Sequence, residues 1–158
     1  MAGPDPDDVS TGIVRRRFDE AEVDVPFKHG RSVIVDLNGE DVWRSELGPG
    51  WSFDDDLKEP YAEGASSCPM THREYVEAGR IRYQMDEGSI VEASAGDVLF
   101  IPPGHRAWVL GDETCVLIDW YATRARHLGR GARSPAAGRA PRRWHVRRLP
   151  RGHRFPLT

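Results

Sequence analysis

Between residues 71 and 120 the chain is divided into short segments by glycine-containing or proline-containing turns, and this division constrains the fold more than any other feature of the sequence. The segments are four to seven residues long and cover 71–76, 80–85, 89–92, 98–101, 107–110 and 114–120. Short runs with this spacing are typical of strands in an antiparallel barrel or jelly roll. No segment of adequate length has helical periodicity. The sequence therefore predicts an all-β fold.

An additional pair of strands is predicted closer to the N-terminus. Residues 32–37 are rich in β-branched side chains and end at Asn38-Gly39, which is a strong signal for a tight hairpin turn. Residues 41–47 then form the expected return strand. One helical turn is expected at 54–58.

The pattern of apolar residues indicates which strand faces are covered. Segment 80–85 alternates, with Ile81, Tyr83 and Met85 on one face. In contrast, segments 98–101 and 115–118 are apolar on both faces, as in strands that are covered on both sides. Because a partner chain can provide the second cover, we expect a homodimer.

Length and charge favour a single domain with two polar ends. A chain of 158 residues can bury one core. We expect a disordered leader at 1–11, a β-barrel domain at 12–123 and an Arg-rich, disordered tail at 124–158.

The sequence has no apolar run long enough to span a membrane, its first ten residues are acidic and proline-rich, unlike a secretory signal, and its two cysteines are unpatterned. These features predict a cytoplasmic protein without membrane contact.

The tail carries a strong positive charge. Residues 124–158 contain 11 arginines and no acidic side chain, whereas all 25 acidic residues precede them. Such a segment has little to bury and repels itself, which favours a solvated tail. Binding of nucleic acid is the alternative, and it would involve this tail alone.

The order of turns resembles that of the cupin superfamily. Gly96, Pro102 and Gly104 match the spacing of the first half of the second cupin motif, and Gly79 lies where the first motif ends. The resemblance covers roughly residues 30–121. It is greatest to small single-domain bacterial cupins in which PPGH is followed by AW and GDE, as in Pro102–His105 and the residues after it. It implies a cupin-type jelly-roll barrel whose open end binds a metal.

The resemblance also implies where metal ligands would lie. In the family, three histidines and a carboxylate bind the metal. By spacing, the histidine pair of the first motif falls at Ser66 and Cys68, the carboxylate falls at His72, and the histidine of the second motif falls at Ala107. The chain therefore departs from the family's ligand set.

An altered ligand set is compatible with strand alternation. Cys68, His72 and Glu74 share a face of a regular strand, and His105 has the same parity as position 107. A thiolate and two imidazoles suit Zn²⁺, or Fe²⁺ when one coordination position stays open. The alternative is that no metal binds. In that case Cys68 is a small buried apolar residue, His72 is a hydrogen-bonded barrel residue and His105 caps a loop carbonyl.

Other polar and aromatic residues could contribute without a metal. An inward Glu74 would have a raised pKa and could act as a general base, whereas an outward Glu74 is a surface acid. Tyr83 could donate a hydrogen bond to a ligand or pack in the core. Asp119 either pairs with an arginine such as Arg82 or lies at the rim of the barrel. Trp51 and Trp108, with Trp43, could line a pocket for a flat ligand, or they could serve packing.

Two functions follow from these residues. In the first, Cys68, His72 and His105 hold a divalent metal, and Glu74 with Tyr83 acts on a small organic substrate in an isomerisation, cyclisation or oxygenation. In the second, the barrel is a non-catalytic module that binds a small molecule without a metal. The sequence does not decide whether the protein is an enzyme.

Overall fold

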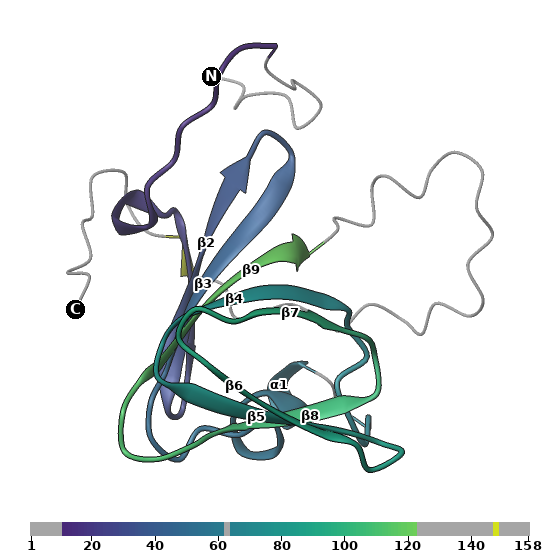
Figure 1. Ribbon diagram of the computed structural model, residues 1–158. Helices are drawn as coiled ribbons and strands as arrows, with labels where there is room; N and C mark the ends of the chain where they lie inside the picture. The colour runs from purple at the N-terminus through teal and green to yellow at the C-terminus, as the bar shows by residue number, and fades with distance from the viewer. Residues whose placement is uncertain (1–10, 62–63, 123–146, 149–158) are drawn as a thin grey trace.

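The computed structural model describes residues 11–61, 64–122 and 147–148, which form two antiparallel β-sheets that face each other (Figure 1). The larger sheet has the strand order β10-β1-β2-β3-β9-β4-β7, and the smaller has the order β6-β5-β8. The strands are β1 (Val23–Phe27), β2 (Gly30–Leu37), β3 (Glu40–Leu47), β4 (His72–Ala78), β5 (Arg80–Met85), β6 (Ile90–Ser94), β7 (Val98–Ile101), β8 (His105–Val109), β9 (Cys115–Ala122) and β10 (Arg147–Arg148). The prediction of an all-β fold is confirmed.

The predicted hairpin joins β2 and β3. Its turn places Asn38 at φ 59° and Gly39 at φ 92°. Two successive residues with positive φ are the requirement of a type I′ turn, whose twist matches that of the paired strands. The two strands pair along their whole length, from Gly30 opposite Leu47 to Leu37 opposite Glu40.

The helical segments are short. They are η1 (Phe18–Glu20), the π-helical turn η2 (Phe53–Leu57) and α1 (Lys58–Tyr61). Thus the turn expected at 54–58 is present. The buried Asp56 carboxylate accepts hydrogen bonds from the backbone N–H groups of His29 (2.6 Å) and Ser52 (3.1 Å), which ties η2 to the turn between β1 and β2.

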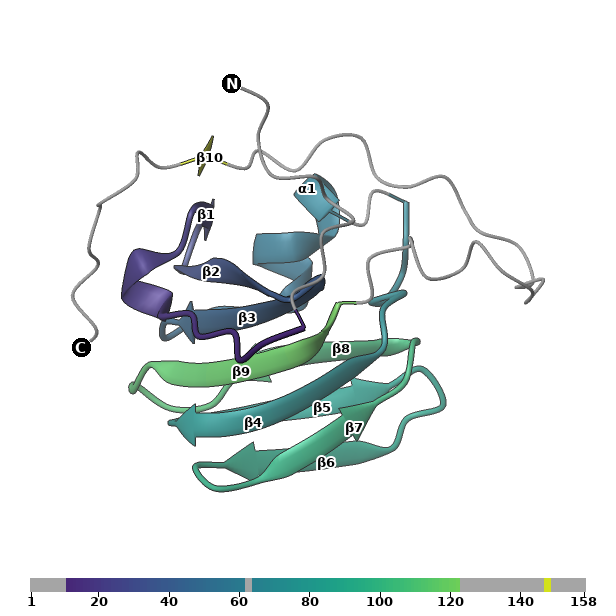
Figure 2. The same ribbon diagram turned by 90° about the horizontal axis from the view of Figure 1, so that it is seen from above.

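The core lies between the sheets because side chains alternate along each strand. β9, β4 and β7 lie over β8, β5 and β6 (Figure 2). On β8, His105, Ala107 and Val109 are buried, whereas the intervening residues are half-buried. Ile81 and Val76 are fully buried, and each such aliphatic side chain stabilises the fold by about 1.5–3 kcal/mol. The same alternation directs the polar residues of the candidate site inward.

The outer face of β7 is not covered within one chain. Val98 and Phe100 are 70% and 64% exposed, whereas Ile101 is buried. The expectation that segment 98–101 is covered on both faces is therefore not met by this chain alone. For the other apolar segment, Cys115, Val116 and Leu117 are all buried.

Most of the predicted leader and tail lie outside the described residues. Of the tail, Arg147–Arg148 is described; it forms β10, with Arg148 opposite Val23 and Arg147 opposite Asp24 of β1. In the ranges that the structure describes, no helix is long and apolar enough to cross a membrane.

Gly79 provides a test of the barrel geometry. Its φ is +74°, and a Cβ there would lie 2.5 Å from the Thr114 carbonyl oxygen and 2.6 Å from the Cys115 Cα. We expect Gly79→Ala to lower the free energy of unfolding by more than the roughly 1–3 kcal/mol of left-handed backbone strain alone, because backbone atoms must also move. Gly111→Ala is the matched control, since its φ is +83° and nothing lies within 4 Å. Equal denaturant midpoints for the two variants would contradict this packing.

Candidate metal centre

Cys68 is fixed next to His105 by the backbone. Its N–H donates to the His105 carbonyl (2.7 Å), and the Gly104 N–H donates to the Cys68 carbonyl (2.8 Å). The segment that precedes β4 is thereby bridged to the first residue of β8. Both side chains are buried, with Cys68 9% exposed and His105 3% exposed.

The corner before β8 orients the His105 ring. Its Nδ1 lies 2.6 Å from the Pro102 carbonyl oxygen. Since a carbonyl can only accept, Nδ1 donates the proton, and Nε2 of a neutral ring keeps its lone pair. This is the carbonyl-capping role expected of His105 if no metal binds. It is also the orientation that a metal-binding imidazole needs, because such rings donate their other N–H to a carbonyl or carboxylate.

His72, the first residue of β4, connects the thiol to a carboxylate. Its Nε2 lies 3.4 Å from Cys68 Sγ, and its Nδ1 lies 2.5 Å from Asp119 Oδ2 on the neighbouring strand β9. The rings of His72 and His105 are edge-to-face, 5.1 Å apart. One ligand atom from each of Cys68, His72 and His105 lies within 4.8 Å of the others.

The electrostatics of this cluster favour a thiolate beside an imidazolium. Burial alone would raise the pKa of the Cys68 thiol, but hydrogen bonds with His105 and His72 and the charge of His72 lower it to about 6. Burial would lower the pKa of His72, but hydrogen bonds with Asp119 and Cys68 and the charge of Glu74 raise it to about 10. A positive charge between a thiolate and a carboxylate is thus stabilised from both sides.

Glu74 points inward, so the surface-acid alternative does not apply. It is 6% exposed and accepts a hydrogen bond from the Tyr83 hydroxyl. Burial, opposed by the charge of His72 and the Tyr83 hydrogen bond, raises the pKa of Glu74 to about 7. Burial and the charge of Glu74 hold the pKa of Tyr83 well above its usual value, so this hydroxyl remains a donor. His72 Nδ1 lies 3.6 Å from Glu74 Oε1.

Comparison with known proteins identifies the fold. No protein-family model matches the sequence, and no curated protein matches it. Among solved structures, the chain resembles oxalate decarboxylase from Lactobacillus farciminis in its formate complex, with a TM-score of 0.50, 18% identity, and coverage of 72% of this chain and 34% of that one. A cupin-2 domain from Rhodospirillum rubrum matches with a TM-score of 0.48, 15% identity, and coverage of 67% and 72%.

The chain has the cupin fold. It spans about a third of the length of the oxalate decarboxylase that it resembles. At this level of identity the likeness concerns the fold alone.

Two of the positions where cupin ligands were expected by spacing carry no ligand here. Ser66 is exposed, and Ala107 is buried in the core opposite Tyr83 of β5. His105 lies two residues before Ala107 on the same face of β8 and contacts the cluster instead. Among the described residues, Cys68, His72 and His105 therefore form a group that could hold a metal.

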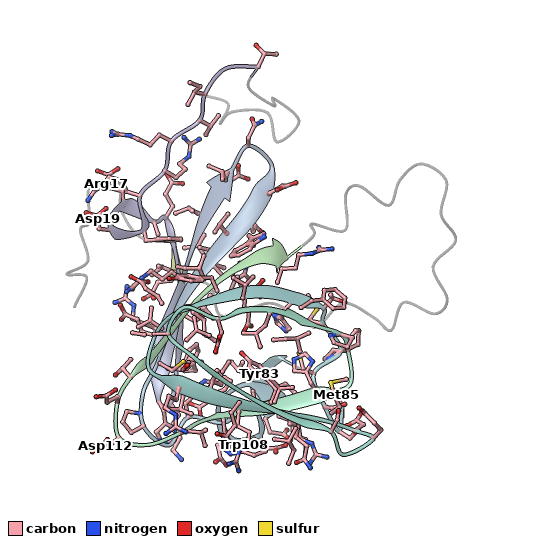
Figure 3. All side chains as sticks on the ribbon, viewed as in Figure 1. Arg17, Asp19, Tyr83, Met85, Trp108 and Asp112 are labelled. Carbon is pink, nitrogen blue, oxygen red and sulfur yellow. The ribbon has the colours of Figure 1, made fainter. Side chains whose placement is uncertain are left out.

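The two tryptophans that were predicted to bind substrate lie elsewhere. The Trp51 carbonyl accepts from Val109, at the other end of β8 from His105, about 13 Å along the strand. Trp51 is 5% exposed and belongs to the core. Trp108 lies on the outer face of the smaller sheet, where the Arg82 guanidinium is 5.8 Å from its ring, whereas Tyr83 points between the sheets (Figure 3).

Asp119 has a more direct role than the sequence suggested. Arg82, one arginine considered as a partner for Asp119, pairs with Glu92. Asp119 instead bonds His72, 47 positions away in the sequence. In the sequence, only its position among apolar neighbours in β9 indicated that Asp119 is unusual. Its contact with His72 depends on the pairing of β4 with β9, in which Glu74 lies opposite Asp119.

Proposed function

We propose that this cupin binds one divalent metal, Zn²⁺ or Fe²⁺, through Cys68 Sγ, His72 Nε2 and His105 Nε2. The donor set fits such an ion, since thiolate and imidazole are ligands of both Zn²⁺ and iron sites. The proposal is supported mainly by the hydrogen bonds that Nδ1 of each histidine ring makes, on the side of the ring away from Cys68. His72 Nδ1 is held by Asp119, and His105 Nδ1 is held by the Pro102 carbonyl. Both Nε2 atoms are thereby oriented toward Cys68, and binding of the metal would release the Nε2 proton of the charged His72 ring.

The proposed reaction is conversion of a small organic substrate at this centre. A three-ligand metal with an open position supplies Lewis-acid activation of a bound substrate oxygen or water. Glu74 has a pKa of about 7 and can hold or release a proton near neutral pH. Tyr83 stays protonated and holds the Glu74 carboxyl in place through its hydroxyl. Glu74 and Tyr83 are thus the proposed proton-handling pair for an isomerisation, cyclisation or oxygenation.

Elemental analysis tests this function. Protein purified without a chelator or a metal-affinity tag should contain close to one equivalent of Zn or Fe per chain. Folded protein that contains no metal, and takes up none when Zn²⁺ or Fe²⁺ is added, would contradict the proposal. That result would leave the non-catalytic module, which binds a small molecule without metal, as the remaining function.

We also propose that the exposed face of β7 is the contact surface of a homodimer. Tyr75, Val98, Phe100 and Trp120 are 38–70% exposed and come from the three neighbouring strands β4, β7 and β9. Val98 is directly opposite Tyr75, and Phe100 is opposite Arg73, whose guanidinium lies 5.7 Å from the Phe100 ring. A contiguous apolar face of this kind is typical of association sites, and a self-complementary patch closes a two-fold dimer.

Replacement of an apolar residue on this face tests the dimer. We expect Phe100→Asp to convert the protein to a monomer in light scattering after gel filtration, because it places a charge in the apolar contact. Ile90→Asp, at a residue 54% exposed on the other sheet, is the matched control and should leave the dimer unchanged. A wild-type protein that is monomeric at high concentration would contradict the proposal.

A further inference from the structure

The surroundings of Cys68 also suit chemistry other than metal binding. The protein contains two cysteines, and their side chains have different neighbours. Cys115 is fully buried, and burial together with the charge of Glu74 raises the pKa of its thiol to about 12. Cys68 instead contacts two imidazoles. The two sulfur atoms therefore differ in their neighbours, because Cys68 lies beside two imidazole rings and Cys115 lies in the apolar core.

Cys68, His72 and Asp119 have the arrangement of an activated nucleophile. The sulfur lies 3.4 Å from His72 Nε2, and the other ring nitrogen lies 2.5 Å from Asp119 Oδ2. A nucleophile within hydrogen-bond reach of a base, with that base oriented by a third group, is the geometric signature of covalent catalysis. Asp119 acts here as a positioning residue, because it fixes the His72 ring through Nδ1.

Burial limits what can reach this sulfur. Cys68 is only 9% exposed, but it directly precedes the exposed residues Pro69 and Met70. The His72 side chain is 22% exposed, so the cluster extends to the surface of the barrel. A small reagent such as a hydroperoxide is therefore a better fit than a bulky disulfide.

We propose that, in the metal-free protein, Cys68 is the nucleophile of a Cys68–His72–Asp119 triad that reacts with hydroperoxides. The Cys68 thiolate attacks one oxygen of hydrogen peroxide, so that an S–O bond forms and the O–O bond breaks. The leaving hydroxide takes the proton from His72 Nε2 and departs as water. The sulfur loses two electrons to become a sulfenic acid, and the peroxide gains them. Because the same sulfur is a proposed metal ligand, bound metal and oxidant compete for it.

Chemical trapping in chelator-treated protein tests this proposal. Protein is exposed to hydrogen peroxide with a 1,3-diketone probe such as dimedone, which labels sulfenic acid, and the adducts are located by peptide mass spectrometry. We expect the adduct on Cys68 and none on Cys115. Trapping avoids confusion with Met70, which is 45% exposed and also gains an oxygen atom in peroxide. Cys68→Ser should lose the adduct, and Cys115→Ser should keep it.

Two variants test the triad itself. His72→Ala and Asp119→Asn should slow adduct formation on the order of tenfold, as expected when a thiolate loses its activating partner. The thermal midpoint of each variant shows that it is folded. Absence of a Cys68 adduct in wild-type protein, or an equal rate in wild type and both folded variants, would overturn the proposal.

Labelling in the presence of Zn²⁺ distinguishes this proposal from the proposed metal function. Preloading with Zn²⁺ should slow the labelling of Cys68 if the two compete. If zinc binds but labelling of Cys68 is unchanged, Cys68 is not a ligand and the proposed metal centre fails, while the nucleophile stands. If zinc binds and Cys68 is unreactive even without metal, the nucleophile fails and the metal centre stands.

Discussion

His72→Ala is expected to abolish metal binding, with the affinity for Zn²⁺ falling by more than 100-fold. His72 is the ligand whose Nε2 faces Cys68 and whose Nδ1 is held by Asp119. Loss of a direct ligand exceeds the roughly 10–100-fold cost of losing a residue that only orients a ligand. Asp119→Asn should therefore lower the affinity by about 10–100-fold and fall between His72→Ala and wild type. Competition with a chromophoric chelator measures the Zn²⁺ affinity of wild type, His72→Ala and Asp119→Asn.

The control for this series is a histidine outside the cluster. His29 Nδ1 bonds Asp56 (2.9 Å), next to η2 and away from Cys68. His29→Ala should bind metal as wild type does, even where it lowers stability. Equal affinities for His72→Ala and His29→Ala would contradict the assignment of His72 as a ligand.

Glu74→Gln should stabilise the metal-free protein at high pH. Folding raises the pKa of Glu74 from 4.5 to about 7, so the folded state holds its proton more tightly than the unfolded state does. The stability that Glu74 contributes is fully present below pH 4.5 and is lost as the pH rises through 7. Gln cannot ionise, and its carbonyl can still accept from Tyr83.

The expected change in the free energy of unfolding follows from the shift in the pKa of Glu74. About 2.5 pKa units correspond to roughly 3 kcal/mol, so the variant should gain on wild type by about 2–3 kcal/mol between pH 4.5 and pH 8.5. Urea unfolding in the presence of a chelator measures this. Glu87→Gln, at an exposed acid in the turn after β5, is the control and should show no such trend. A difference between Glu74→Gln and wild type that does not change with pH would show that folding leaves the pKa of Glu74 near 4.5, and it would contradict this prediction.

Local patterns predicted most of the fold. The strand at 80–85 has the predicted bounds, and so does the strand at 98–101, because each is bounded by turns that contain glycine or proline. Strand β1 was not predicted, since its charged residues and Pro26 mask a short pairing with β2. The sequence also could not show that Arg147–Arg148 pairs with β1, because the pairing involves residues more than 120 positions apart.

Part of the candidate site was also predictable from local sequence patterns. Strand alternation and the Pro102-Pro103-Gly104 corner were enough to propose Cys68, His72 and His105 as neighbours. The partner of His72 was not accessible, because Asp119 reaches it through the pairing of β4 with β9. Alternation also explains why Trp108 lies outside the barrel, since it is between the inward residues Ala107 and Val109.

X-ray absorption at the metal edge of purified, metal-loaded protein identifies the atoms that bind the metal. For Zn²⁺ we predict one sulfur ligand at about 2.3 Å and two imidazole nitrogen ligands at about 2.0–2.1 Å, and loss of the sulfur ligand in Cys68→Ser. A shell of oxygen and nitrogen without sulfur in the wild-type protein would contradict it.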